Sequence, residues 1–262
     1  MKAVKALGLD MIQVSKLPER YYTPEGAREF VAAMRETGIH ASAVVVVFDG
    51  ESYRDQDAVR ETVGFRPARL LAGRIAHARR CVDLASAIGA KIVTFHVGFL
   101  PANADDADYR GMLDAVSRVA AYAETKQVTI SLETGQETAA ELARFIDQIK
   151  SARVGVNFDT ANLVLYGIED PPVALRALLA RVTSVHLKDG LPPADPHRLG
   201  TEVRLGDGKA DVKTCLRILA EAGFQGPLVI ENYVWRAGTD PLSELRKAKE
   251  FALSTLAGFE TN

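Results

Sequence analysis

Residues 129–162 read TISLETGQETAAELARFIDQIKSARVGVNFDTAN, and this stretch contains two short segments of strand length on either side of an amphipathic one. The segments Thr129–Glu133 and Val154–Asp159 each end in a carboxylate, and 138–149 has the apolar spacing of a helix. Mainly apolar strands joined by a helix are typical of a parallel sheet covered on its outer face. The stretch therefore predicts one β/α unit with an acidic residue at the carboxyl end of each strand.

The same alternation runs along the whole chain. Further strands are predicted at Met11–Ser15, Ala41–Phe48, Lys91–Val97, Thr183–Lys188 and Pro227–Asn232, and further helices at 25–37, 69–88, 108–125, 172–180, 211–222 and 240–256. Alternating strands and helices without a long linker predict one parallel sheet wrapped by helices. We expect a (β/α)8 TIM barrel that forms a single domain over residues 1–262.

The strand count is one short of eight, because the chain opens inside what reads as its first helix. We therefore expect that the first strand is missing or trimmed from the sequence. An absent strand leaves two sheet edges that another chain segment or a partner would have to cover. We also expect a homo-oligomer, either a dimer or a tetramer.

The composition of the chain indicates which partners and which cellular location to expect. The 262 residues carry 32 basic and 34 acidic side chains that are mixed along the chain, so neither nucleic acid nor an anionic membrane is expected as a partner. Cys81 and Cys215 lie among apolar neighbours, which favours buried thiols in a reducing compartment. No apolar run is long enough for a membrane span, and a cytoplasmic location is expected.

Ionisable residues gather at the carboxyl ends of the predicted strands, where a barrel builds its active site. They are His96, Glu133, Asp159, His186, Lys188 and Glu231. Carboxylates that converge on one point repel one another unless a cation lies between them. An oxygen-rich set with one imidazole predicts a divalent ion, Mn²⁺ first, with Mg²⁺, Co²⁺ or Zn²⁺ as alternatives.

Four motifs, LETG, FDTAN, HLKDG and IEN, make the chain similar to the xylose isomerase-like barrels, a family that includes ketose 3-epimerases, inosose dehydratase and endonuclease IV. The resemblance implies that Glu133, Asp159, His186 and Glu231 hold one metal ion. It also implies a sugar isomerase or epimerase that works through a metal-stabilised enediolate, with Glu133 and Glu231 as the proton-transferring pair. Lys188 is expected to assist catalysis.

The expected substrate is a small sugar or polyol, with or without phosphate, and His96, Gln136, Asn162 and Lys188 are the predicted contacts. Asn162 departs from the histidine that the epimerases and the nuclease commonly place there, so the contact made by that position is open. Gly206 and Gly208 could bring backbone amides to a phosphate, or could form only a tight turn. Tyr233 and Trp235 either line the barrel mouth or pack under the last helix.

Three alternatives stay open beside the epimerase hypothesis. The same site could run an inosose dehydratase or a 3-keto-sugar lyase reaction, since elimination begins with the same proton abstraction. The chain could also be a non-catalytic barrel that binds a sugar or metal. Nuclease action is disfavoured, because the stretch after HLKDG lacks further histidine ligands and the chain has no basic surface signal.

Overall fold

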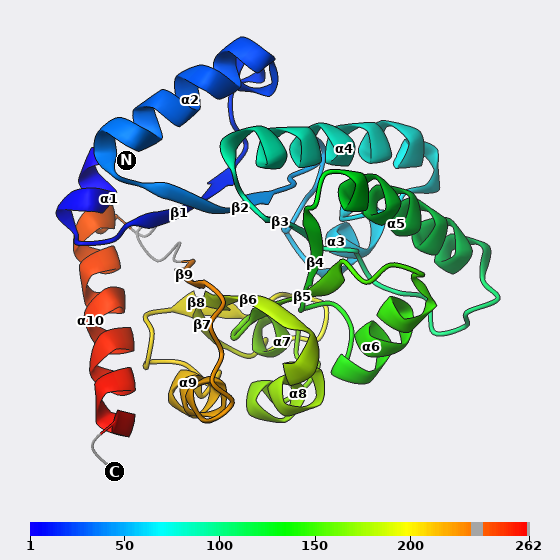
Figure 1. Ribbon diagram of the computed structural model, residues 1–262. Helices are drawn as coiled ribbons and strands as arrows, with labels where there is room; N and C mark the ends of the chain where they lie inside the picture. The colour runs from blue at the N-terminus through cyan, green and yellow to red at the C-terminus, as the bar shows by residue number, and fades with distance from the viewer. Residues whose placement is uncertain (232–237, 261–262) are drawn as a thin grey trace. The chain divides into compact units, whose positions relative to one another are not determined.

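The computed structural model describes residues 1–231 and 238–260 of the chain (Figure 1). The residues form two units with separate internal packing. The first contains Met1–Ser52, Ala58–Glu133 and Phe145–Gly155, and the second contains Tyr53–Asp57, Thr134–Arg144 and Val156–Asn262. Helices α3 (Gln56–Thr62) and α6 (Ala139–Gln148) each contribute residues to both units.

The first unit is built on four parallel strands. They are β1 (Met11–Ser15), β2 (His40–Val45), β3 (Ile92–Phe95) and β4 (Thr129–Glu133), hydrogen-bonded in that order. The helices of this unit are α1 (Lys2–Ala6), α2 (Pro24–Thr37), α4 (Leu71–Ile88) and α5 (Ala107–Thr125). All four residues of β3 are buried, as expected for a parallel strand with both faces covered.

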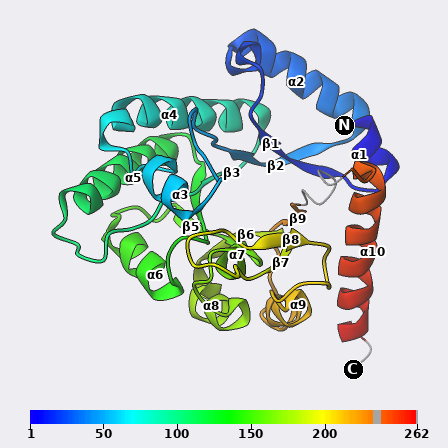
Figure 2. The ribbon, with the colours of Figure 1, turned by 180° about the vertical axis from the view of Figure 1, so that it is seen from behind.

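Helices α4 and α5 lie side by side along β3 and β4, and both views of the ribbon show this (Figures 1 and 2). Their inner faces carry fully buried side chains such as Val82, Met112 and Val119. Phe95 of β3 and Leu132 of β4 are also buried. Apolar burial of this kind is the main term that stabilises the unit.

The second unit continues the pattern with three parallel strands. They are β5 (Val154–Asp159), which belongs to this unit from Val156 on, β6 (Val182–Leu187) and β9 (Leu228–Ile230). Its helices are α7 (Asn162–Leu165), α8 (Pro171–Leu178), α9 (Val212–Glu221) and α10 (Pro241–Glu260). A small antiparallel hairpin, β7 (Asp189–Leu191) with β8 (Thr201–Val203), follows β6.

Each of the seven predicted strands corresponds to an observed one; β1, β4 and β5 have the predicted bounds, and the bounds of the other four differ by at most three residues. The end of the last predicted strand, Asn232, lies outside the described residues. The hairpin β7–β8 and the helices α3 and α7 were not predicted, because segments of three to seven residues are too short to show a period. The prediction of a single domain stays a prediction.

The backbone shows how two helices end, and the burial confirms the predicted buried thiols. Gly38 and Gly89 end α2 and α4 with φ of 62° and 83°, the left-handed conformation that suits glycine after a helix. Cys81 and Cys215 are free thiols and both are buried. Among the described helices, none is both long and apolar enough to cross a bilayer.

A buried ion-pair cluster joins the loop before α9 to helix α10. The Glu244 carboxylate accepts hydrogen bonds from Arg204 Nε at 2.6 Å and Arg204 Nη2 at 3.0 Å, and Lys247 Nζ lies 3.0 Å from its Oε1 atom. The Glu244 side chain is only 2% exposed. These two cations hold the pKa of Glu244 below its usual value of 4.5, at about 2.

Replacing Glu244 by Gln should reduce the free energy of unfolding at pH 7. The pKa of Glu244 is lower in the folded chain than in the unfolded chain, so the carboxylate stabilises the fold above pH 4.5 and loses this effect as the pH falls toward 2. Urea unfolding of wild type and Glu244→Gln from pH 7 to pH 2 should show the two curves converging. Glu250→Gln, an exposed change on the same helix, serves as the control. A constant difference across this range would contradict the assignment.

Candidate metal centre

Strand pairing brings four ionisable side chains together at the carboxyl ends of β5, β6 and β9. Asp159, the last residue of β5, is the register partner of His186 on β6. Lys188 lies two residues beyond His186, on the same face of the strand. Glu231 directly follows β9, and its backbone N–H donates to the Leu187 carbonyl at 3.2 Å. The parallel register alone therefore places these groups next to one another.

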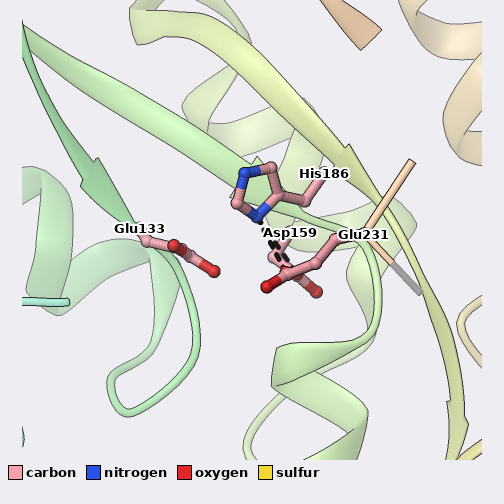
Figure 3. Close-up of side chains that lie close together, drawn as sticks. All are labelled: Glu133, Asp159, His186 and Glu231. Atoms are coloured by element: carbon pink, nitrogen blue, oxygen red, sulfur yellow. Dashed lines mark ion pairs between the residues drawn. The ribbon is translucent and has the colours of Figure 1, made fainter. Parts of the chain in front are cut away.

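The distances show a tightly connected cluster of opposite charges. Lys188 Nζ lies 3.0 Å from Asp159 Oδ2 and 2.9 Å from Glu231 Oε2. His186 Nδ1 lies 2.9 Å from the same Glu231 oxygen and 3.6 Å from Asp159 Oδ2 (Figure 3). Asp159 is fully buried, whereas the Glu231 side chain is 23% exposed. Of these two carboxylates, Glu231 is therefore the more accessible to a ligand.

Asp159 is held in place through both its side chain and its backbone. Its Oδ1 atom accepts hydrogen bonds of 2.8 Å from the backbone N–H groups of Ala161 and Asn162, at the start of α7. Its own N–H donates to Thr134 Oγ1 at 2.9 Å, and Thr134 donates back to its carbonyl at 3.3 Å. Since Oδ1 is occupied, Oδ2 is the oxygen that Asp159 presents to the cluster.

The electrostatics favour an ionised Glu231. Burial raises the pKa of this carboxyl, but the Lys188 ammonium and then His186 outweigh burial and hold the pKa of Glu231 well below its usual value. The carboxylate is therefore available as a ligand or as a base near neutral pH.

Glu133 ends β4, and its Oε1 atom lies 3.5 Å from His96 Nε2. The next residue, Thr134, donates its backbone N–H to the Asn157 carbonyl at 3.1 Å, so the strand end is anchored on both sides. One ligand atom from each of Glu133, Asp159, His186 and Glu231 lies within 4.8 Å of the other three (Figure 3).

This donor set fits one divalent ion. Ligand atoms about 2.1 Å from a shared ion are at most roughly 4.2 Å apart, which is close to the observed spacing. Three carboxylates and one imidazole suit Mg²⁺, Mn²⁺ or Zn²⁺. Lys188 Nζ contacts the Asp159 and Glu231 oxygens that face the cluster, so in this structure its charge balances the carboxylates.

Two of the predicted substrate contacts, Gln136 and Asn162, form hydrogen bonds within the protein. Gln136 is buried and its Nε2 atom donates to the Tyr166 hydroxyl at 3.1 Å. Asn162 is buried, and its Nδ2 atom donates to the Thr134 carbonyl at 3.1 Å. Their contacts with a substrate stay predictions. Tyr233 and Trp235 lie outside the described residues.

Two residues of this region were missed in the sequence. Thr134 fixes Asp159, and the only signal was its position directly after a strand that ends in Glu133. The Glu51 carboxylate accepts from the backbone N–H of Gly64 at 2.8 Å and of Phe48 at 3.3 Å. Burial raises the pKa of Glu51 above its usual value. The two amides and the nearby His96 lower this pKa but do not outweigh burial. No strand end or motif pointed to Glu51.

The comparison with known protein families decides the classification. The family described as xylose isomerase-like TIM barrel matches residues 1–253. The chain belongs to this family. A solved xylose isomerase domain protein from Planctomyces limnophilus is 31% identical, with a TM-score of 0.91 over 99% of this chain and 92% of that one. The predicted TIM-barrel fold is thus confirmed for this xylose isomerase-like chain.

Relatives of this xylose isomerase-like barrel carry more than one activity in their names. An inosose dehydratase of Clostridium tetani is 32% identical over 130 residues, which cover 45% of this chain and 43% of that enzyme, so the match spans less than half of the dehydratase. An L-ribulose-5-phosphate 3-epimerase of Escherichia coli is 22% identical over 98% of this chain and 89% of its own. A barrel from Mycobacterium smegmatis, solved with magnesium, is 22% identical with a TM-score of 0.73, covering 98% of this chain and 87% of that one.

Replacing Thr134 by Val should destabilise the fold by about 2 kcal/mol, because the buried N–H and carbonyl of Asp159 lose their hydroxyl partner. Thr134→Ser keeps the hydroxyl and should recover most of this loss. Urea unfolding of the three proteins measures the difference. Equal stability of the Val and Ser variants would show that the hydroxyl does not hold Asp159.

Proposed function

We propose that this protein is a divalent-metal-dependent isomerase or epimerase that acts on a small sugar or polyol. The cluster of Glu133, Asp159, His186 and Glu231 is the observation that carries the proposal, because its four ligand atoms lie within 4.8 Å of one another. The family match over residues 1–253 and the whole-length similarity to a ribulose-phosphate epimerase support the same reaction class. The magnesium complex of the Mycobacterium smegmatis barrel supports a divalent ion.

The proposed ligands are Glu133, Asp159, His186 and Glu231. A divalent ion held there would polarise a substrate carbonyl and make the neighbouring C–H more acidic. Mn²⁺ was the first expectation from the sequence, but the donor set suits Mg²⁺ equally well. Asp159 and His186, which are almost completely buried, are suited to a purely structural part in holding the ion.

The two glutamates are the proposed proton-transferring pair. Glu231 is ionised and partly exposed, so it can remove a proton from the carbon next to the substrate carbonyl. If Glu133 returns a proton to the opposite face of that carbon, the product is an epimer. Return of the proton to the neighbouring carbon gives aldose–ketose isomerisation instead.

Lys188 and three neutral or weakly basic groups complete the proposed site. The Lys188 ammonium lies 2.9 Å from the Glu231 oxygen and can stabilise negative charge as it develops on a substrate oxygen. His96, Gln136 and Asn162 are the proposed partners of substrate hydroxyls. His96 already contacts Glu133, so it can also orient this carboxylate.

A dehydratase is the second candidate, and the identity of 32% with part of an inosose dehydratase favours it. Proton abstraction by a glutamate is common to both reactions, but dehydration also expels a hydroxide, which needs a proton donor. Lys188, with its ammonium between Asp159 and Glu231, is the group placed to help. Loss of water from an inosose or a 3-keto sugar, without epimerisation of ketoses, would identify this activity.

Metal content tests the proposed ligands directly. After dialysis against Mn²⁺ or Mg²⁺, elemental analysis of the wild type should find about one ion per chain. Glu133→Gln, Asp159→Asn, His186→Asn and Glu231→Gln should each weaken or abolish binding, since each removes one donor. Glu221→Gln, an exposed change of the same kind on α9, should leave the content unchanged. A correctly folded wild type without bound metal would refute the proposal.

Proton exchange tests the chemistry. In D₂O the wild type should exchange the C–H next to the carbonyl of a suitable ketose, which NMR detects as loss of the proton signal. Glu133→Gln and Glu231→Gln should slow this exchange by roughly 10²- to 10⁴-fold, the usual contribution of a positioned base. Glu221→Gln again provides the matched control. Normal exchange in both site variants would exclude the two glutamates as the proton-transferring pair.

A further inference from the structure

The Glu51 carboxylate connects two loops of the first unit. Its Oε1 atom accepts a hydrogen bond of 2.8 Å from the backbone N–H of Gly64, and its Oε2 atom accepts one of 3.3 Å from the N–H of Phe48. Phe48 lies beyond the end of β2, and Gly64 belongs to residues 62–65 at the end of α3, here called the anchor segment. Hydrogen bonds to a charged acceptor are among the stronger ones in proteins, so the carboxylate holds the two loops together.

Arg74 of α4 binds the anchor segment through its carbonyl groups. Its Nη2 atom donates to the Thr62 carbonyl at 2.7 Å, and its Nη1 atom donates to the Gly64 carbonyl. The guanidinium also lies over the Phe48 ring, 4.9 Å from the ring centroid. Arg74 is only 4% exposed, and a charge this deeply buried requires such partners. Gly64 is therefore fixed at its N–H by Glu51 and at its carbonyl by Arg74.

The anchor segment packs directly against the residues that follow His96. Phe65 donates its backbone N–H to the Val97 carbonyl at 2.9 Å. A Cβ atom at Gly64 would lie 2.2 Å from the Val97 oxygen, and one at Gly98 would lie 2.5 Å from a carbonyl oxygen of the anchor segment. The φ angles of Gly64 and Gly98 are 67° and 92°, so both positions need glycine for conformation as well as for space. A shift of the anchor segment would therefore displace the backbone next to His96.

His96 is the point at which these contacts reach the candidate metal centre. Its Nε2 atom lies 3.5 Å from Oε1 of Glu133, one of the four proposed ligands. Because His96 immediately precedes Val97, the position of the Val97 backbone determines where the imidazole lies relative to Glu133. A group that contacts substrate loses much of its effect when it is displaced by about 1 Å.

We infer that Glu51 and Arg74 are positioning residues that hold His96 beside Glu133 through the anchor segment. The inference rests on the proposed function and adds two residues that belong to neither the proposed ligands nor the proposed substrate contacts. A residue that only stabilises the fold would leave His96 unchanged in protein that remains folded. Replacement of Glu51 or Arg74 should instead alter His96 in the folded state.

Nuclear magnetic resonance tests the position of His96 without any turnover. The chain has five histidines, and His96→Gln identifies the His96 ring signals by their loss from protein dialysed against Mg²⁺. Glu51→Ala removes both acceptor oxygens, so the His96 Cε1–H signal should shift. Glu51→Gln keeps one acceptor oxygen for the Gly64 N–H and should shift the signal less. Glu61→Ala, which removes an exposed carboxylate of α3, should leave it in place.

Proton exchange in D₂O tests whether the effect on the chemistry passes through His96. Glu51→Ala should lower kcat by roughly 10- to 100-fold, the cost of a misplaced group, while the metal content stays that of the wild type because the four ligands are kept. The double variant with His96→Gln should have the kcat of His96→Gln alone, since both changes act on one group. Arg74→Lys, which can still donate to a carbonyl, should lose less activity than Arg74→Met.

The other possible results also decide the question. An unshifted His96 signal in folded Glu51→Ala would overturn the inference, and so would losses in kcat that multiply in the double variant. If Glu51→Ala does not fold, Glu51→Gln and Arg74→Lys are measured by the same criteria. Absence of exchange by the wild type with every sugar would count against the proposed function, while the His96 signal would still test the inference.

Discussion

The shared contact of Lys188 with Asp159 and Glu231 is the interaction on which the rest of the site depends. Carboxylates from two strands approach one another closely only if a positive charge lies between them, since repulsion and lost hydration otherwise oppose their ionisation. In this chain the ammonium supplies that charge, and the proposed divalent ion would share this role. The same position therefore serves the stability of the strand ends and the proposed chemistry.

The rigid parts of the site arise from hydrogen bonds that use backbone groups. Asp159 is fixed by two amides at the start of α7 and by the Thr134 hydroxyl, while Asp189 is fixed by four amides. Backbone donors lose little conformational freedom when they bind, so they hold a carboxylate more firmly than long side chains do. Glu231 has no comparable set among the described contacts, and its side chain is 23% exposed, so it is the more accessible of the two carboxylates that Lys188 contacts.

The sequence was sufficient to predict the strands and the ionisable residues at their carboxyl ends, but not the contacts that support them. Strand ends are visible because a short apolar run stops at a charged residue, as in Glu133 and Asp159. The partners of these residues depend on loop geometry, which leaves no periodic signal. Asp189 is the clearest case, because its four donors lie up to 21 residues away. Thr134 and Glu51 were not predicted, because their contacts also depend on loop geometry.

Lys188 and Asp189 are neighbours in the chain with unrelated tasks, and this adjacency limits how the protein can evolve. The Lys188 ammonium contacts the carboxylates of the cluster, whereas the Asp189 carboxylate accepts hydrogen bonds from the loop. The two side chains point in different directions because they are consecutive residues at the end of β6. Deletion of one residue before Asp189 would place this anion among carboxylates, and insertion of one residue before Lys188 would place this cation among amide donors. Variation in length should therefore accumulate in the hairpin between 191 and 201, while the spacing from His186 to Asp189 stays constant among functional descendants.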